Sequence, residues 1–193
     1  MGGVGRLGDA GQIADDFVVL TTSRSRAEEA RRRITEVLAG LGLRLHPDKT
    51  RIVFLGGGED GFDFLGFHHR KTPSKFGDRR YLSKWPSSRA MASVRVKVRD
   101  RTDRRFASRD LHAVIADLNP VLRGWGVYFR YGNSNRKFAA IDSYVHERMA
   151  KLASVKYATR GRLQASRFNY GWLSGLGVYR LTGSVRRWST AHA

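Results

Sequence analysis

The chain has 193 residues, of which 41% are hydrophobic, and it contains no cysteine. This length can bury one core or two small ones, and the lack of cysteine excludes disulfides and thiolate metal sites. No apolar run approaches membrane-spanning length and no signal peptide is visible, so we expect a cytoplasmic protein without a membrane partner.

The net charge of +19 is unevenly distributed along the chain. Residues 1–67 hold 9 Lys and Arg against 10 Asp and Glu, whereas residues 68–193 hold 27 against 7, a net of +20. A polyanion is the expected partner of the basic part. A membrane surface is the weaker alternative, because aromatic residues are interleaved with the basic ones and suit stacking on bases.

The first third of the chain predicts a small α+β unit. Residues 1–11 are rich in glycine and read as a flexible N-terminus. Over residues 12–69 we expect a strand at 17–22, then an amphipathic helix capped by Ser25 that ends near Gly40. Short strands follow at 43–45, at 50–55 and along the phenylalanine-rich residues 62–67.

The remainder predicts a helical domain. Residues 70–86 read as a basic linker hairpin and residues 87–193 as helices. Ser87 or Ser88 caps a helix to 101, Ser108 caps one over 109–118, and Asn119-Pro120 starts a third that reaches 129. Asn133 or Ser134 caps a fourth. Its apolar stripe predicts packing in the core. The stripe consists of Phe138, Ile141, Tyr144, Val145, Met149, Leu152 and Val155.

Asp15 and Asp16 are adjacent carboxylates next to an apolar run. Their charges repel each other, and a divalent cation in a tight turn would neutralise both. The alternative is an ordinary turn, since aspartate favours turns without any metal. These residues alone leave both interpretations open.

Five motifs in this order resemble those of a known family. They are Ala14-Asp15-Asp16, the segment His46-Pro47-Asp48-Lys49-Thr50, the segment Phe64-Leu65-Gly66, the segment 118–125 beginning Leu-Asn-Pro, and the closing segments 172–173 and 176–181. Together they resemble the C-terminal half of the group II intron-encoded reverse transcriptases, or maturases. The resemblance implies part of a reverse-transcriptase palm over 12–69 and an α-helical thumb, the maturase-specific RNA-binding domain, over 87–193.

The family resemblance also implies roles for single residues. Asp15 and Asp16 would be catalytic ligands of Mg²⁺ in a two-metal site, and Lys49 would lie near the incoming triphosphate. Lys49 is alternatively a surface lysine. Phe64, Leu65 and Gly66 would shape the primer-grip turn, or alternatively serve as strand core.

Two functions follow from the resemblance. The first is an RNA-directed DNA polymerase that acts on an RNA/DNA primer-template. This activity needs a further palm Asp and the fingers, and neither is visible in this sequence. We therefore expect the chain to be inactive unless the missing fingers and palm half is supplied in trans. The second is a non-catalytic maturase fragment, or decayed remnant, that binds intron RNA and aids splicing. The RNA-binding candidates are Arg123, Trp125, Arg130, Arg136, Lys137, Arg160, Arg162 and Arg167. Core packing is the alternative for Trp125, and a solvated surface for each basic residue.

Overall fold

The computed structural model describes residues 17–56, 60–74, 77, 79–158 and 167–186. The chain divides into two compact units, Met1–Ile52 and Val53–Ala193, and each is described by itself. The expected flexible N-terminus at 1–11 lies outside the described residues.

The first unit is built on a single described helix, α1, which spans Arg24–Gly40. Its N-cap is Ser23, whose hydroxyl accepts the backbone N–H of Arg26, so the cap lies two residues before the predicted Ser25. Gly42 ends the helix with a left-handed φ of 72°. No residue of α1 is buried, and its apolar Val37 is 66% exposed.

The strands predicted in this unit do not form. No strand is found at residues 17–22, 43–45 or 50–52, and these residues form no β-ladder with other described residues. The same holds for residues 53–55 in the second unit. A strand needs a partner for its backbone N–H and C=O groups, which local apolar sequence cannot supply. Mixed helix and antiparallel sheet support the α+β class, whereas the palm arrangement is not confirmed.

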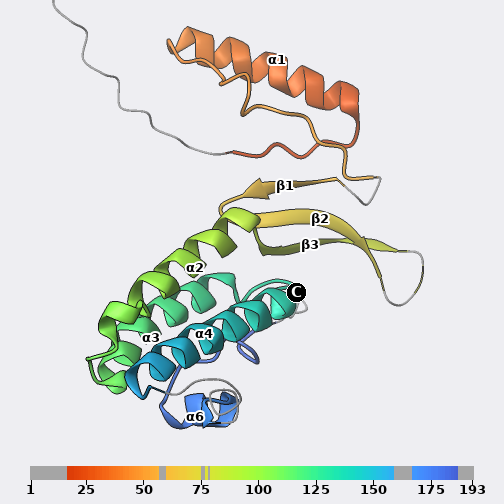
Figure 1. The fold of residues 1–193 in the computed structure, drawn as a ribbon. Coiled ribbons are helices and arrows are strands. Elements are labelled where there is room, and N and C mark those ends of the chain that lie inside the picture. The colour runs from red at the N-terminus through yellow and green to blue at the C-terminus, as the bar shows by residue number, and fades with distance from the viewer. Residues whose placement is uncertain (1–16, 57–59, 75–76, 78, 159–166, 187–193) are drawn as a thin grey trace, which may run out of the picture. The chain divides into compact units, whose positions relative to one another are not determined.

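The second unit opens with a three-stranded antiparallel sheet of order β1-β2-β3, visible in Figure 1. The strands are β1 (Gly61–Phe64), β2 (Phe67–Pro73) and β3 (Arg80–Pro86). Residues 62–67 therefore form two strands rather than one. Leu65 and Gly66 connect them with φ values of 48° and 77°, the positive pair that a two-residue hairpin turn requires.

Helices α2 (Ser88–Arg101) and α3 (Leu111–Phe129) follow, joined through the 3₁₀ turn Arg104–Phe106. Ser87 caps α2 as predicted, by accepting the N–H of Ala90. The two helices expected over 109–129 are one helix, which Asp110 caps and which contains Pro120 in its interior. Proline removes one helical hydrogen bond, but Leu118 and Leu122 on either side are fully buried and hold the helix together.

Helix α4 (Asn135–Lys156) supplies the centre of the core, and α6 (Tyr170–Gly175) packs against it. Figure 1 shows α2, α3 and α4 lying together, with α6 on the side of α4 away from the sheet. Most of the predicted α4 stripe is buried, although Val155 is exposed. The largest fully buried side chains of α4 include Phe138, Ile141 and Met149, and burial of each stabilises the fold by roughly 1.5–3 kcal/mol.

Candidate nucleic-acid interface

The predicted catalytic residues are only partly described. Asp15 and Asp16 lie outside the described residues, as do Arg160 and Arg162. Lys49 lies in a turn after α1, with its side chain exposed and its backbone N–H bonded to the carbonyl of His46 at 3.2 Å. Among the described residues, no group of three His, Cys, Asp or Glu side chains could hold a metal ion.

The hairpin turn at Phe64–Gly66 is held against the helices by hydrogen bonds at its two central residues. The Tyr128 hydroxyl donates to the carbonyl of Leu65 at 2.8 Å, and the backbone N–H of Ser87 donates to the carbonyl of Gly66 at 2.9 Å. The turn is therefore fixed beside the start of α2 and the C-terminal end of α3. The Leu65 side chain is 57% exposed, so it presents an apolar tip to solvent rather than core.

An aromatic cluster joins the sheet to α3. The ring of Phe67 lies 4.7 Å from that of Phe129 and 5.6 Å from that of Tyr128, centroid to centroid. His69 stacks on Phe62 at 5.1 Å. Partial burial there lowers the pKa of His69, and the neighbouring charges of Lys84 and His68 lower it further, so its neutral form is favoured.

The described arginine candidates belong to the second unit, Val53–Ala193, which is called the helical unit from here on, and several of them lie over aromatic rings. The guanidinium of Arg123 lies 5.1 Å from the Tyr179 ring centroid, and that of Arg167 lies 5.2 Å from the Tyr157 ring. Arg130 lies 4.8 Å from the ring of the next residue, Tyr131, and its Nη2 donates to that hydroxyl. Stacking on a ring pre-orients a guanidinium and leaves its edge for a phosphate.

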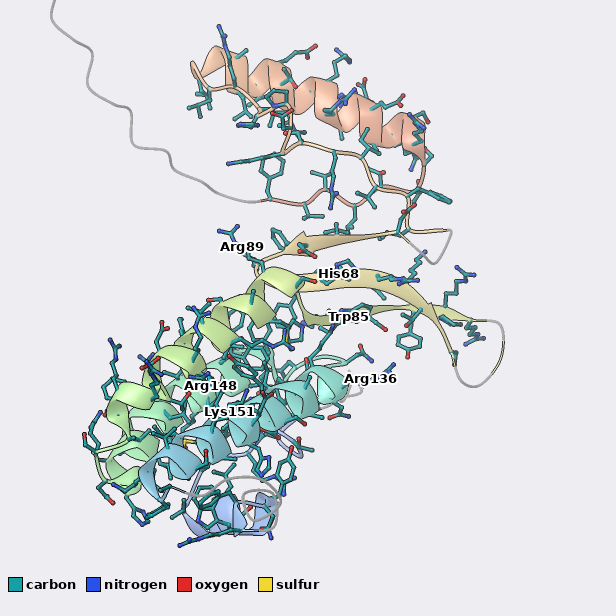
Figure 2. The ribbon with its side chains drawn as sticks, in the orientation of Figure 1. His68, Trp85, Arg89, Arg136, Arg148 and Lys151 are labelled. Carbon is teal, nitrogen blue, oxygen red and sulfur yellow. The ribbon has the colours of Figure 1, made fainter. Side chains whose placement is uncertain are left out.

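The last two basic candidates and Trp125 differ in their surroundings. Arg136 is exposed and Lys137 half-buried in the first turn of α4; Figure 2 shows Arg136 at that end of the helix. Trp125 instead packs in the core, with ring centroids 4.9 Å from Phe129 and 5.4 Å from Phe138. The position of Trp125 therefore favours core packing, the alternative to RNA binding.

Helix α2 carries a basic surface that sequence reasoning missed. Its buried residues are Met91, Val94 and Val98, at helical spacing. The other positions hold five basic side chains, Arg89, Arg95, Lys97, Arg99 and Arg101, with Asp100 as the only acid. The apolar spacing was the signal, because it places most of the basic positions of the helix away from its buried face.

Not every arginine of the helical unit is available to a ligand. Arg148 on α4 donates to the Thr102 hydroxyl at 3.1 Å and to the Thr102 carbonyl at 3.0 Å, and so holds the C-terminal end of α2. Its place between the helices is visible in Figure 2. Lys151 pairs with Glu147 at 2.5 Å, and this contact lowers the pKa of that carboxyl.

Three carboxylates of the helical unit accept backbone N–H groups, whereas Asp117 and Glu147 form exposed pairs with Arg109 and Lys151. Asp103 and Asp110 cap the 3₁₀ turn and α3. Asp142, which is buried, accepts the N–H groups of Leu181 and Thr182 at 3.0 and 2.8 Å. Because residues 68–193 hold 27 basic side chains against 7 acidic ones, most of the basic surface has no acidic counterpart.

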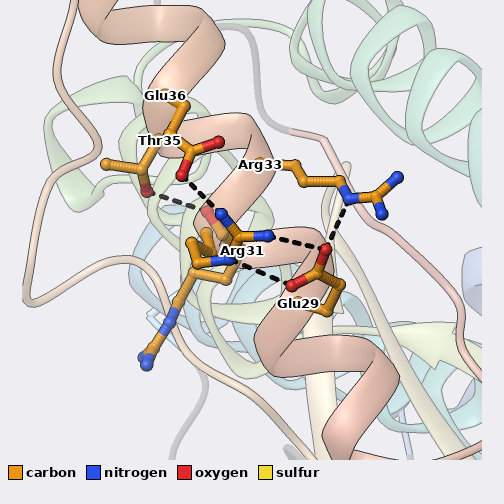
Figure 3. Close-up of polar contacts among 6 residues, drawn as sticks. Glu29, Arg31, Arg33, Thr35 and Glu36 are labelled. Carbon is orange, nitrogen blue, oxygen red and sulfur yellow. Dashed lines mark hydrogen bonds and ion pairs between the residues drawn. The ribbon is translucent and has the colours of Figure 1, made fainter.

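Helix α1 in the first unit has the opposite pattern. Glu29 accepts hydrogen bonds from Arg32 and Arg33, and Arg32 also pairs with Glu36 at 2.6 Å, as Figure 3 shows. The two guanidinium groups lower the pKa of Glu29, and the carboxylates raise that of Arg32. These exposed pairs balance the charge of α1 locally, so a polyanion gains less here than on the helical unit.

Comparison with known proteins finds a family match that lies within the helical unit. Residues 91–170 match the family model "Group II intron, maturase-specific domain". A curated relative, "Protein YkfC" of Escherichia coli (strain K12), is 38% identical over 81 residues, which cover 41% of this chain and 20% of YkfC. The match thus spans about a fifth of that relative.

Among the described residues, no helix has the length and apolar character to cross a membrane. Residues 91–170 match the maturase-specific domain of group II intron proteins, which supports the resemblance of this chain to the C-terminal portion of a group II intron maturase.

Proposed function

We propose that this chain binds group II intron RNA through its helical unit and assists splicing of that RNA. The observation that carries the proposal is the coincidence of the maturase-specific domain with a basic surface that has few acidic counterparts. Phosphate contacts supply most of the affinity for RNA, while shape and stacking supply recognition.

The arginine geometry supports the same proposal. Arg123 and Arg167 lie against aromatic rings and remain exposed, so each can offer hydrogen bonds to a phosphate at little further cost in side-chain entropy. Arg136 and Lys137 extend the positive surface to the start of α4. These side chains come from α3, α4 and the segment before α6, as suits a folded RNA with several phosphate strands.

The test is a titration of the protein with a transcribed group II intron RNA at several salt concentrations. We expect the logarithm of the affinity to fall linearly with the logarithm of salt, by about 0.7–0.9 per phosphate contact. The triple variant Arg123→Gln, Arg136→Gln, Lys137→Gln should lower the slope by about two units if these residues contact phosphates.

A matched control removes the same charge elsewhere. The triple variant Arg24→Gln, Arg32→Gln, Arg33→Gln breaks the exposed ion pairs of α1 and should leave the slope nearly unchanged. A salt-independent affinity, or an equal loss from both triple variants, would contradict the proposal.

A second candidate function is RNA-directed DNA polymerisation. It is supported by the adjacent Asp15 and Asp16, which would hold Mg²⁺, and by the hairpin turn at Leu65-Gly66, which would position a primer. Lys49 would face the triphosphate. Primer extension on poly(rA)/oligo(dT) with Mg²⁺ tests it, with and without a fingers-and-palm polypeptide in trans. We expect no extension by this chain alone; extension that Asp15→Ala abolishes would establish polymerase activity.

A further inference from the structure

The sheet of the helical unit has two faces of different character. Residues directly opposite each other on neighbouring strands share a face, and successive residues alternate. Phe67 lies on the face that packs on α3 through Phe129. The opposite face, called here the outer face, carries Gly61, Asp63, His68, Arg70, Tyr81 and Trp85 by register.

The side chain of His68, which belongs to β2, lies beside β1 on the outer face. Its Nδ1 lies 2.7 Å from Oδ1 of Asp63, and its Nε2 lies only 2.5 Å from where a Cβ on Gly61 would be. The imidazole therefore occupies the space that a side chain at Gly61 would fill, and Asp63 fixes its orientation. The side chain of His68 remains 30% exposed.

Trp85 continues this aromatic surface onto β3. It is the direct partner of His68 across β2 and β3, with ring centroids 5.2 Å apart and planes tilted by 41°. Both side chains are half-buried, and Figure 2 shows them next to each other on the sheet. Tyr81, 47% exposed, lies on the same face farther along β3.

We propose that the outer face is a stacking surface for unpaired nucleotides of the bound RNA; this inference rests on the proposed function. Every base has a π-face, so aromatic side chains on a sheet bind single strands with little sequence preference. Arg70, on the same face by register, supplies a positive charge that suits a phosphate backbone. Asp63 lies at the turn end of β1, where it disfavours phosphate and can accept a base amino group.

The experiment compares two RNA probes on the full chain: a blunt RNA duplex, and the same duplex with a single-stranded tail of about five nucleotides, within the site size of a single-strand-binding surface. The wild-type protein should bind the tailed probe more tightly. Trp85→Leu should weaken binding of the tailed probe by about 5- to 100-fold, the effect of losing one stacked base, and leave the blunt duplex unchanged.

Second variants separate stacking from a folding defect. Trp85→Phe keeps a ring and should retain most of the tail-dependent affinity, whereas His68→Leu keeps the bulk without the ring and should lose part of it. Tyr170→Leu removes an exposed tyrosine near α4 and should have no tail-dependent effect. Urea unfolding of each variant establishes that the fold is retained.

The outcomes distinguish the two proposals. If the wild-type protein binds neither probe, RNA binding itself is wrong, and the stacking surface with it. If the wild-type protein binds both probes equally, only the stacking surface is wrong. The same conclusion holds if Trp85→Leu weakens binding of the two probes equally, or weakens binding of neither probe. Unchanged affinities for both probes are also the result expected if the outer face binds another protein instead.

Discussion

Asp142 holds the C-terminal segment onto α4, and Asp142→Ala should release it. The carboxylate is 8% exposed and accepts the N–H groups of Leu181 and Thr182 together with the Thr182 hydroxyl. Leu181 itself is fully buried in the core. Removal of Asp142 therefore leaves backbone donors without acceptors beside an apolar contact that depends on them.

The magnitude follows from the three hydrogen bonds. Each bond to a charged acceptor contributes about 1.5–3 kcal/mol, but the three share one carboxylate and are not additive. We expect Asp142→Ala to lower the free energy of unfolding by roughly 3–5 kcal/mol. If residues 176–186 detach locally first, the global loss is smaller and appears instead as local opening.

Two measurements cover both cases. Urea unfolding followed by far-UV circular dichroism reports the global loss, and amide hydrogen exchange reports protection at Leu181 and Thr182. Asp117→Asn is the matched control, because Asp117 forms an exposed ion pair with Arg109 at 2.9 Å and should cost under about 0.5 kcal/mol. A loss below about 1 kcal/mol with unchanged exchange at both amides would refute the assignment of Asp142 as the anchor.

Two further predictions concern the core and the sheet. In Gly126→Ala, the new Cβ would lie 2.6 Å from Leu181 Cδ2, so overpacking should lower the free energy of unfolding by about 1–3 kcal/mol, measured by urea titration. His69 has a lowered pKa in the folded state, so the unfolded state binds its proton first and stability should fall as pH drops below about 6.5. His69→Gln should reduce this fall between pH 7.5 and 5.5, and an unchanged pH dependence would contradict it.

The sequence predicted those helices whose signals are local. The serine before α2 caps that helix in the structure, and the apolar spacing of α4 identifies its buried face. Caps and helical periodicity act within a few residues, so they can be read without knowledge of the tertiary fold.

Asn119-Pro120 shows how a local signal can be overridden. An asparagine before a proline is a common helix start, yet here α3 continues through both residues. The Asn119 side chain instead donates to the carbonyl of Gly177 at 2.9 Å and accepts the N–H of Tyr179 at 2.8 Å. It thus serves a segment some sixty residues away, a partner that no local pattern contains.

The candidate site was predictable in its charge and less so in its individual residues. Arginines at exposed helical positions follow from composition and spacing, but the inward role of Arg148 depends on where α2 ends against α4. The burial of Trp125 depends likewise on the packing of α3 and α4. Sequence shows that a residue is capable of binding RNA, whereas tertiary packing decides whether it faces solvent.

Stability and nucleic-acid binding use different charged groups in the helical unit. Asp142 and Arg148 bond to backbone groups across elements, so their hydrogen-bonding groups are used within the fold. Arg123 and Arg136 are exposed, and their charges add to the external field. The acids are few, 7 against 27 basic residues over 68–193, so the surface stays positive. The excess positive charge repels itself within the unit, and it leaves the exposed basic side chains to a polyanion.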